Sequence, residues 1–153
     1  MSDVIIWKQD NGVVAVTHPA GNCGLTTEEI AQKDVPDGKP YNIRDSSELP
    51  DASIFRDAWV VDEETWTIST DMELAREVWR NKIRLARASK WEEVDAAWFQ
   101  AMEADDTNRV TAIVAIKDSL RDFPNQEAIN EAETIEQLQE IWNTELLGDK
   151  EWL

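Results

Sequence analysis

The chain has 153 residues, a formal net charge of -17 and 42% hydrophobic residues, which suits one globular domain or two very small ones. With one cysteine the chain can form no internal disulfide and no zinc site built on several thiolates. Its one histidine makes a multi-histidine metal site improbable. A chain this acidic is repelled by phosphate backbones, which disfavours nucleic-acid binding. No apolar run is long enough to cross a membrane, and no signal peptide is visible. We therefore expect a soluble cytoplasmic protein without a cofactor.

The N-terminal segment has the pattern of a β-hairpin. Residues 4–8 and 13–17 are rich in valine and isoleucine, and Asn11 and Gly12 lie between them. Asn-Gly tolerates the positive φ angles that a tight turn needs. The sequence therefore predicts two antiparallel strands joined by a short turn.

A short helix and further strands follow the hairpin. Thr26 and Glu29 have the spacing of a capping box, which predicts a helix that starts beside Thr26. Residues 41–45 suit a strand, and residues 55–61 and 65–69 suit a second hairpin across the acidic turn between them.

From Thr70 onward the apolar residues change to a helical period, and Thr70 with Glu73 predicts a capping box at the start of the first helix. The apolar face of this helix is expected to comprise Met72, Ala75, Trp79, Ile83 and Ala86. A second helix is expected to carry Trp91, Val94, Trp98 and Met102 on one face. Residues 105–108 are polar and predict a break.

The last third of the chain is predicted to be helical as well. After the break, a third helix is expected to carry Val110, Ile113, Val114 and Leu120 and to end before Pro124. A short helix is expected at 126–131, and another starts at a capping box formed by Thr134 and Gln137 and runs through Leu138 and Trp142. Gly148 is the expected stop.

These patterns predict an α+β protein in two modules. Residues 1–69 are expected to form a small N-terminal antiparallel β module with a short helix. Residues 70–147 are expected to form a C-terminal helical hairpin or small bundle, and residues 148–153 a frayed tail.

The basic residues concentrate in one part of the predicted helices. On a helical wheel, four arginines fall within an arc of about 80°, beside the apolar face: Arg76, Arg80, Arg84 and Arg87. Such a stripe can dock a partner, because arginine binds carboxylates and stacks on aromatic rings. The stripe can also pair with the chain's own acids, for example Glu73 three residues before Arg76, and the surplus of acids favours this second interpretation.

The chain has eight tryptophans: Trp7, Trp59, Trp66, Trp79, Trp91, Trp98, Trp142 and Trp152. A core of this size cannot easily bury all of them, so some should be partly exposed. Trp59 and Trp66 can form a cross-strand pair in the second predicted hairpin. Trp79, Trp91 and Trp98 have the spacing of core residues, and Trp152 is the strongest candidate for exposure.

No residue set predicts catalysis or metal binding. The acidic clusters at 62–64, 92–93 and 105–106 match no calcium-loop spacing and suit solvated turns and helix starts. His18 and Cys23 lie on one predicted loop, but no orienting third group or anion hole accompanies them.

Several segments resemble phage proteins. The stretches VIIWKQDNGVVAV, TTEEIAQKDVPDGKPY and FRDAW resemble small proteins encoded beside tail-fibre genes in tailed bacteriophages. RNKIRLARASKWEEVD at 80–95 and IKDSLRDFP at 116–124 resemble the bacteriophage tail assembly chaperone family. The matching positions are Arg80, Asn81, Arg84, Trp91, Leu120, Arg121, Asp122 and Pro124. The family pattern usually has a second pair of aromatic and basic residues before the final Leu-Arg-Asp. This chain has residues 116–119, Ile-Lys-Asp-Ser, at that place.

The resemblance implies a non-enzymatic protein of the host-cell cytoplasm that binds tail or tail-fibre polypeptides and assists their folding or assembly. We expect no nucleic-acid or membrane partner, and association with the virion and homo-oligomerisation stay open. From charge and pattern, the expected contact surface comprises Arg76, Trp79, Arg80, Arg84, Arg87, Trp91 and Trp98. The alternatives are an acidic nucleic-acid mimic that inhibits a host factor and a minor tail or fibre component of the virion.

Overall fold

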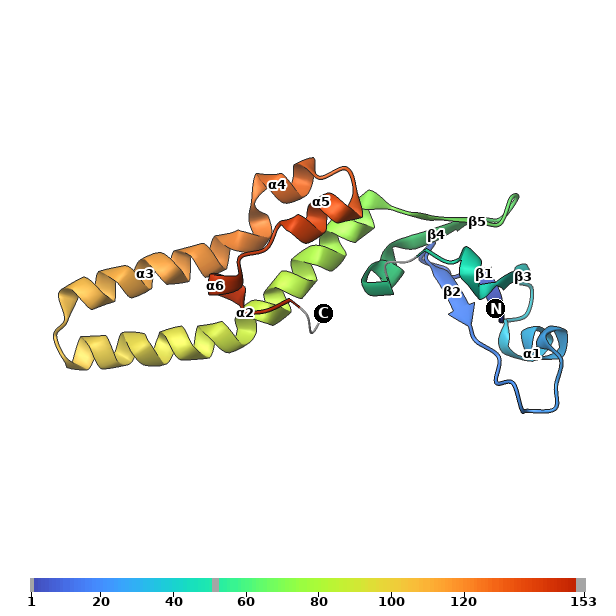
Figure 1. Ribbon diagram of the computed structural model, residues 1–153, viewed down its shortest axis with the longest axis horizontal. Coiled ribbons are helices and arrows are strands. Elements are labelled where there is room, and N and C mark those ends of the chain that lie inside the picture. The colour runs from blue at the N-terminus through green and yellow to red at the C-terminus, as the bar shows by residue number, and fades with distance from the viewer. Residues whose placement is uncertain (1, 51–52, 151–153) are drawn as a thin grey trace. The chain divides into compact units, whose positions relative to one another are not determined.

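The computed structural model describes residues 2–50 and 53–150 and confirms the α+β class (Figure 1). The chain divides into two compact units, Met1–Ala75 and Arg76–Leu153, which are described separately below. The sequence placed the module boundary between residues 69 and 70, whereas the structural division falls inside a helix, α2 (Met72–Glu103).

The first sheet of the N-terminal unit has three antiparallel strands in the order β2-β1-β3. They are β1 (Asp3–Lys8), β2 (Val14–Thr17) and β3 (Tyr41–Asp45). The predicted hairpin is confirmed, since β1 pairs with β2 and Gly12 takes a φ of 87° in the turn. A positive φ of this size suits glycine, which has no Cβ.

The second hairpin is shorter than the sequence suggested. Its strands are β4 (Trp59–Asp62) and β5 (Thr67–Thr70), which pair antiparallel. The residues before β4 form a 3-10 helix, η2 (Ser53–Ala58), and another, η1 (Ser46–Glu48), follows β3. The predicted strand from 55 is therefore wrong in its first half.

The predicted Trp59–Trp66 cross-strand pair is also wrong. Trp59 lies opposite Thr70, and Trp66 belongs to the turn, where its φ is 58°. The turn is one residue longer than the acidic triplet that the sequence marked, which shifts the register of the second strand.

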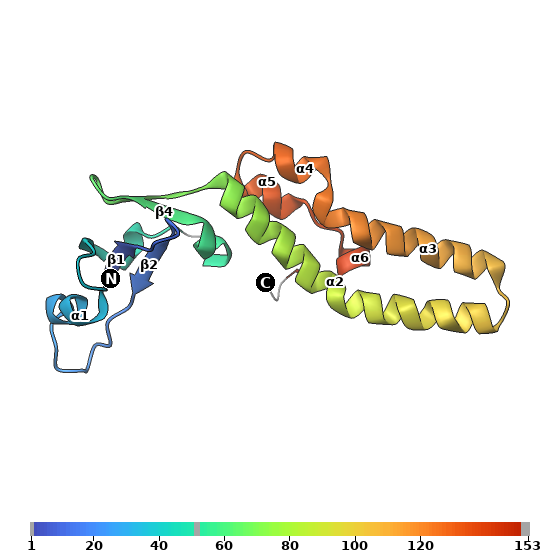
Figure 2. The ribbon, with the colours of Figure 1, turned by 180° about the vertical axis from the view of Figure 1, so that it is seen from behind.

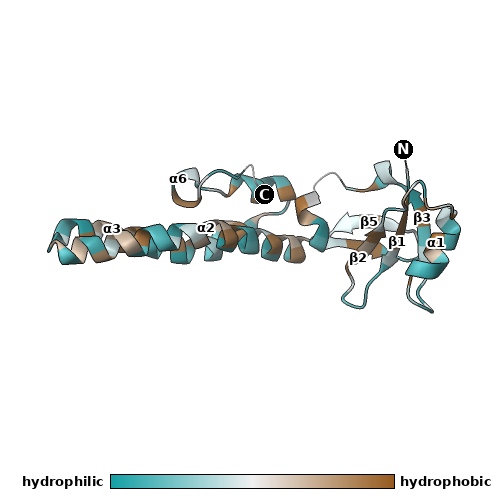
Figure 3. Ribbon diagram, turned by 90° about the horizontal axis from the view of Figure 1, so that it is seen from below, coloured by the Kyte–Doolittle hydropathy of each residue, from teal (hydrophilic) through white to brown (hydrophobic). Residues whose placement is uncertain are grey.

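The core of this unit lies on both faces of the first sheet, because side chains alternate along β1. One cluster contains Val4, Ile6, Val14, Val16, Trp59 and Val61. On the opposite face, Ile5 packs with Ile30, Ala31 and Val35. Helix α1 (Thr27–Asp34) supplies part of this second cluster, and its predicted capping box is confirmed in both directions. Figure 3 shows the hydrophobic character of β1 in this unit.

The helical unit is built on a long hairpin. Helix α2 runs without a break, so the prediction of two helices in this stretch is wrong; no glycine or proline interrupts it. Its start is capped by the Asp71 carboxylate, which accepts a hydrogen bond from the Leu74 amide at 3.1 Å, and not by Thr70. The predicted break at 105–108 is confirmed at Asp105 and Asp106, whereas Thr107 and Asn108 already belong to α3 (Thr107–Asp122).

Short helices complete this unit: η3 (Phe123–Asn125), α4 (Glu127–Glu131), α5 (Ile135–Glu140) and α6 (Thr144–Leu147). They lie beside the early part of α2 and the end of α3 (Figure 2). The buried residues that join them include Trp79, Ile83, Leu120, Ile129, Leu138 and Leu147.

Two details of the C-terminal part differ from the prediction or lie outside the description. Helix α5 ends at Glu140, so Trp142 lies between helices rather than within one. Gly148 ends α6 with a φ of 85°, as expected of a stop. The predicted frayed tail and the predicted exposure of Trp152 fall largely on 151–153, outside the described residues.

Candidate functional site

Two arginines of the predicted stripe bind backbone carbonyls within the helical unit. The Arg87 guanidinium donates to the carbonyl oxygens of Leu120 and Arg121 at 2.8 and 3.0 Å. These oxygens lie in the last turn of α3, where helical carbonyls have no partner within the helix. The Arg76 guanidinium donates to the Ala132 carbonyl oxygen at 2.8 Å, directly after α4. Both side chains therefore fasten later segments onto α2.

Arg80 and Arg84 share one carboxylate. Glu77 accepts from Arg84 at 2.7 Å and lies 3.5 Å from Arg80. The hydrogen bond from Arg84 holds the pKa of Glu77 below its usual value of 4.5, and the positive charges of both arginines act in the same direction. Arg80 also donates to the side-chain oxygen of Asn130 on α4.

Burial lowers the pKa of the Arg87 guanidinium, and the neighbouring positive charge of Arg84 lowers it further. An arginine still carries its charge at neutral pH, so the hydrogen bonds to the end of α3 are charge-assisted. This arrangement places a cation at the negative end of a helix dipole.

Trp79 lies in the core and not on a surface. Its side chain is 1% exposed, its indole N–H donates to the Ile141 carbonyl oxygen at 3.1 Å, and its ring lies 5.6 Å from that of Trp142. A partner cannot reach it without unfolding this part of the unit.

The structure corrects the predicted docking surface at Trp79, and it gives each of the four arginines a partner within the unit. Trp79 is buried. Arg76, Arg80 and Arg87 reach α4, the residue after it or the end of α3. Arg84 contacts Glu77 and Asn81 on α2 itself. The structure agrees better with the alternative interpretation, in which the arginines pair with groups of the chain itself. The acid that Arg80 and Arg84 contact is Glu77. Arg76 donates to a carbonyl, where the sequence suggested Glu73.

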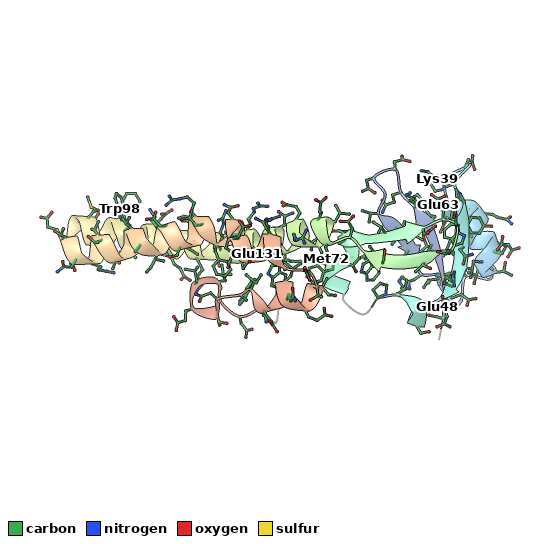
Figure 4. The ribbon with its side chains drawn as sticks, turned by 90° about the horizontal axis from the view of Figure 1, so that it is seen from above. Lys39, Glu48, Glu63, Met72, Trp98 and Glu131 are labelled. Carbon is green, nitrogen blue, oxygen red and sulfur yellow. The ribbon has the colours of Figure 1, made fainter. Side chains whose placement is uncertain are left out.

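The other two predicted residues lie further along α2. Trp91 and Trp98 are half-buried, and Trp98 lies near the junction of α2 with α3 (Figure 4). Beyond α6, this end of the unit consists of α2 and α3 alone within the part of the chain that the structure describes (Figures 1 and 2). Hydrophobic stretches also occur in this part of the hairpin (Figure 3).

Large apolar side chains are exposed at this end. Phe99 is 62% exposed, Met102 48% and Val114 42%. On α2, Trp98, Phe99 and Met102 fall within about 100° of arc, and the rings of Trp98 and Phe99 meet edge to face at 5.2 Å. We call Trp98, Phe99, Met102 and Val114 the hairpin patch.

Lys117 shows that α2 and α3 contribute to one side of the hairpin. Its ammonium lies 2.7 Å from the Asp95 carboxylate and 5.2 Å from the centre of the Trp98 ring. Val114 precedes Lys117 by three residues on α3 and so lies beside it. The hairpin patch therefore spans both helices, and its nearest cation is already paired.

The rim of the hairpin patch is acidic. Glu103 follows Phe99 by four residues, Glu92 precedes it by seven, and Asp118 follows Val114 by four, which places each on the same stripe as an apolar member. All three are exposed. Residues 91–118 hold seven acidic residues and two basic ones.

The cavities of the N-terminal unit do not assemble a reactive centre. His18, Cys23, Leu25 and Ile30 help to line a cavity of about 300 Å³. The Cys23 thiol is exposed, and its sulfur lies 4.0 Å from the Leu25 carbonyl oxygen. Neither side chain has an orienting partner of the kind that a nucleophile needs, within the residues that the structure describes.

Comparison with known proteins gave no relative: no family model, no curated protein and no solved structure matches the chain. Within 2–50 and 53–150, no helix is long and apolar enough to cross a membrane. The same residues contain no group of three or more histidine, cysteine and acidic side chains that could hold a metal ion.

Sequence reasoning missed the exposure of the hairpin patch. The helical pattern places Met102 and Val114 on apolar helix faces and does not single out Phe99. The signal was present in the length of the helices, because two helices that extend beyond their neighbours can bury only the narrow strip between them. In the distal part of this pair that strip is occupied by Ala101 and Ile113.

Proposed function

We propose that the chain is a non-enzymatic assembly factor that binds tail or tail-fibre polypeptides of a bacteriophage and assists their folding or assembly. The partner class comes from the resemblance of residues 80–95 and 116–124 to tail assembly chaperones. The structural observation that supports binding is the hairpin patch, a set of exposed and half-buried apolar side chains on the distal part of α2 and α3, where the described residues include no third layer.

The physical argument concerns aggregation. A fibre subunit that has not yet trimerised exposes apolar surface and strand edges, which associate with one another. A small protein that covers such a surface and carries a net charge of -17 keeps the complex soluble by mutual repulsion. The hairpin patch supplies the contact, and the acidic surface supplies the solubility.

Co-expression tests the proposal directly. Tail and tail-fibre polypeptides encoded in the same genome are produced with and without the chain, and soluble and insoluble fractions are compared. We expect one of these polypeptides to move to the soluble fraction and to co-purify with the chain. If none of them does either, the proposal is wrong. Detection of the chain in purified particles would identify it as a virion component.

A second candidate function is nucleic-acid mimicry, which is favoured because the arginines of the stripe bind groups within the helical unit. A basic stripe across an acidic surface argues against mimicry, but these guanidinium groups are held within the helical unit. The chain then presents mainly carboxylates, since 32 acidic residues face 15 basic ones. A mimic should compete with duplex DNA for a DNA-binding enzyme, whereas an assembly factor should not.

A further inference from the structure

We infer that the hairpin patch receives a basic amphipathic helix of its client, which adds as a third helix to α2 and α3. The inference rests on the proposed function, because it specifies the chemistry of the client segment. It follows from the secondary structure around the patch, from the charge of its rim and from its length.

The occupant should be a helix because of what surrounds the patch. Both elements that form it are α-helices, so no sheet edge with free backbone groups is available to pair with a strand. Two adjacent helices present ridges and a groove into which the side chains of a third helix fit. The apolar side chains of Phe99, Met102 and Val114 would then contact residues spaced three and four apart on the incoming helix.

The occupant should be basic because the rim is acidic. Glu92, Glu103 and Asp118 flank the apolar side chains, and the Lys117 ammonium is already paired with Asp95. A second copy of the chain would bring the same acidic rim against this one, and like charges in contact oppose association. Lysine or arginine on the outer flanks of the incoming helix would instead pair with the rim.

The length of the uncovered stretch limits the size of the segment. From Trp91 to its end at Glu103, α2 extends about 20 Å at 1.5 Å per residue, which matches a helix of about 13 to 14 residues. The client segment is therefore about four turns long, with apolar residues on one face and basic residues on the other.

Binding of synthetic peptides to the full chain tests the inference. The probe is a peptide of about 14 residues with leucine at positions i, i+3, i+4 and i+7 and lysine elsewhere. One control peptide has glutamate in place of lysine. A second keeps the leucine and lysine composition but scrambles the order, so that its charge is unchanged and its apolar stripe is lost. Affinity is measured by calorimetry, and the indole signal of Trp98 is followed by NMR.

Two sets of variants locate the contact. Phe99→Ser combined with Met102→Ser removes the centre of the patch, and Leu85→Ser is the matched control, because Leu85 is on the same helix and, like Phe99, is 62% exposed. Circular dichroism verifies that each variant is folded. We expect the lysine peptide to bind at least about tenfold more tightly than either control peptide and to shift the Trp98 signal. The double variant should lose about tenfold in affinity, and Leu85→Ser should bind as the wild type does.

Three results would overturn the inference: equal affinity for the lysine and control peptides, unchanged affinity of the double variant, or a dimer of the chain that dissociates in the double variant. The last result would identify a second copy as the occupant.

Failure of the proposed function gives a different combination of results. If the peptide binds at the patch but no tail or tail-fibre polypeptide is retained in co-expression, only the assembly role is wrong. If such a polypeptide is retained equally by the double variant, only the patch is wrong.

Discussion

Replacement of Arg87 by methionine tests whether the arginine stripe is structural. Arg87→Met keeps the apolar stem of the side chain and removes the guanidinium, which donates to the Leu120 and Arg121 carbonyl oxygens at 2.8 and 3.0 Å. If the stripe is structural, the variant should lose stability. If the stripe serves mainly to contact a partner, the variant should lose binding and keep its stability.

The expected loss can be worked from these contacts. A hydrogen bond that involves a charged group contributes about 1.5 to 3 kcal/mol, and one nitrogen shared by two acceptors counts nearer to one such bond than to two. The favourable position at the end of α3 adds a few tenths to about 1 kcal/mol. We therefore expect a loss of about 2 to 3 kcal/mol, or roughly 10 to 20 °C in the melting temperature of a unit of this size.

Thermal unfolding followed by circular dichroism at a helix wavelength measures this loss, because most of the helix belongs to the helical unit. Arg109→Met is the matched control: Arg109 is on α3, and its exposed side chain makes no ion pair with a described residue. The control should change stability by less than about 0.5 kcal/mol. A melting temperature of Arg87→Met within about 2 °C of the wild type, or an equal loss in both variants, would refute the structural role.

Three further variants have defined outcomes. Thr26→Ala removes the cap of α1 and should destabilise the N-terminal unit by about 1 kcal/mol in urea unfolding; an unchanged midpoint would contradict this. Gly148→Ala should cost about 1 kcal/mol or more, since a φ of 85° strains alanine whatever space is available, and a thermal midpoint equal to the wild type would contradict it. Because Arg84 lowers the folded-state pKa of Glu77, this carboxylate contributes stability above its usual pKa of 4.5 that is lost as the pH falls below it. The difference in stability between wild type and Glu77→Gln should therefore be largest near neutral pH and shrink in acid, and a constant difference would exclude this pair as its source.

The features that the sequence predicted correctly are those that depend on neighbouring residues. The Asn11-Gly12 turn and the Thr26 cap each involve groups a few positions apart, so the residues that decide them stand together in the sequence. Thr134 likewise caps α5 by accepting from the Gln137 amide. Turn and capping chemistry is local, which is why a pattern suffices to place it.

The features that the sequence did not predict depend on distant segments. The Trp79 indole N–H donates to the Ile141 carbonyl 62 positions later, and the Arg76 guanidinium donates to the Ala132 carbonyl 56 positions later. A helical wheel shows that such residues share an arc, but it does not show which other segment lies against that arc. The sequence therefore leaves docking and self-pairing both open for the arginine stripe, and it cannot identify the carbonyl partners that the later segments supply.

The internal use of the arginines changes what kind of partner the chain can attract. The guanidinium groups bound to carbonyls or to Glu77 keep their charge, but their donors are already occupied, so fewer of them are free to bind the carboxylates of a partner. An acidic client, which a free arginine stripe would have attracted, is disfavoured on this surface. The exposed apolar side chains of the hairpin patch and their acidic rim instead favour a basic client, and the wild-type affinities for the lysine and glutamate peptides distinguish these two cases without any substitution in the chain.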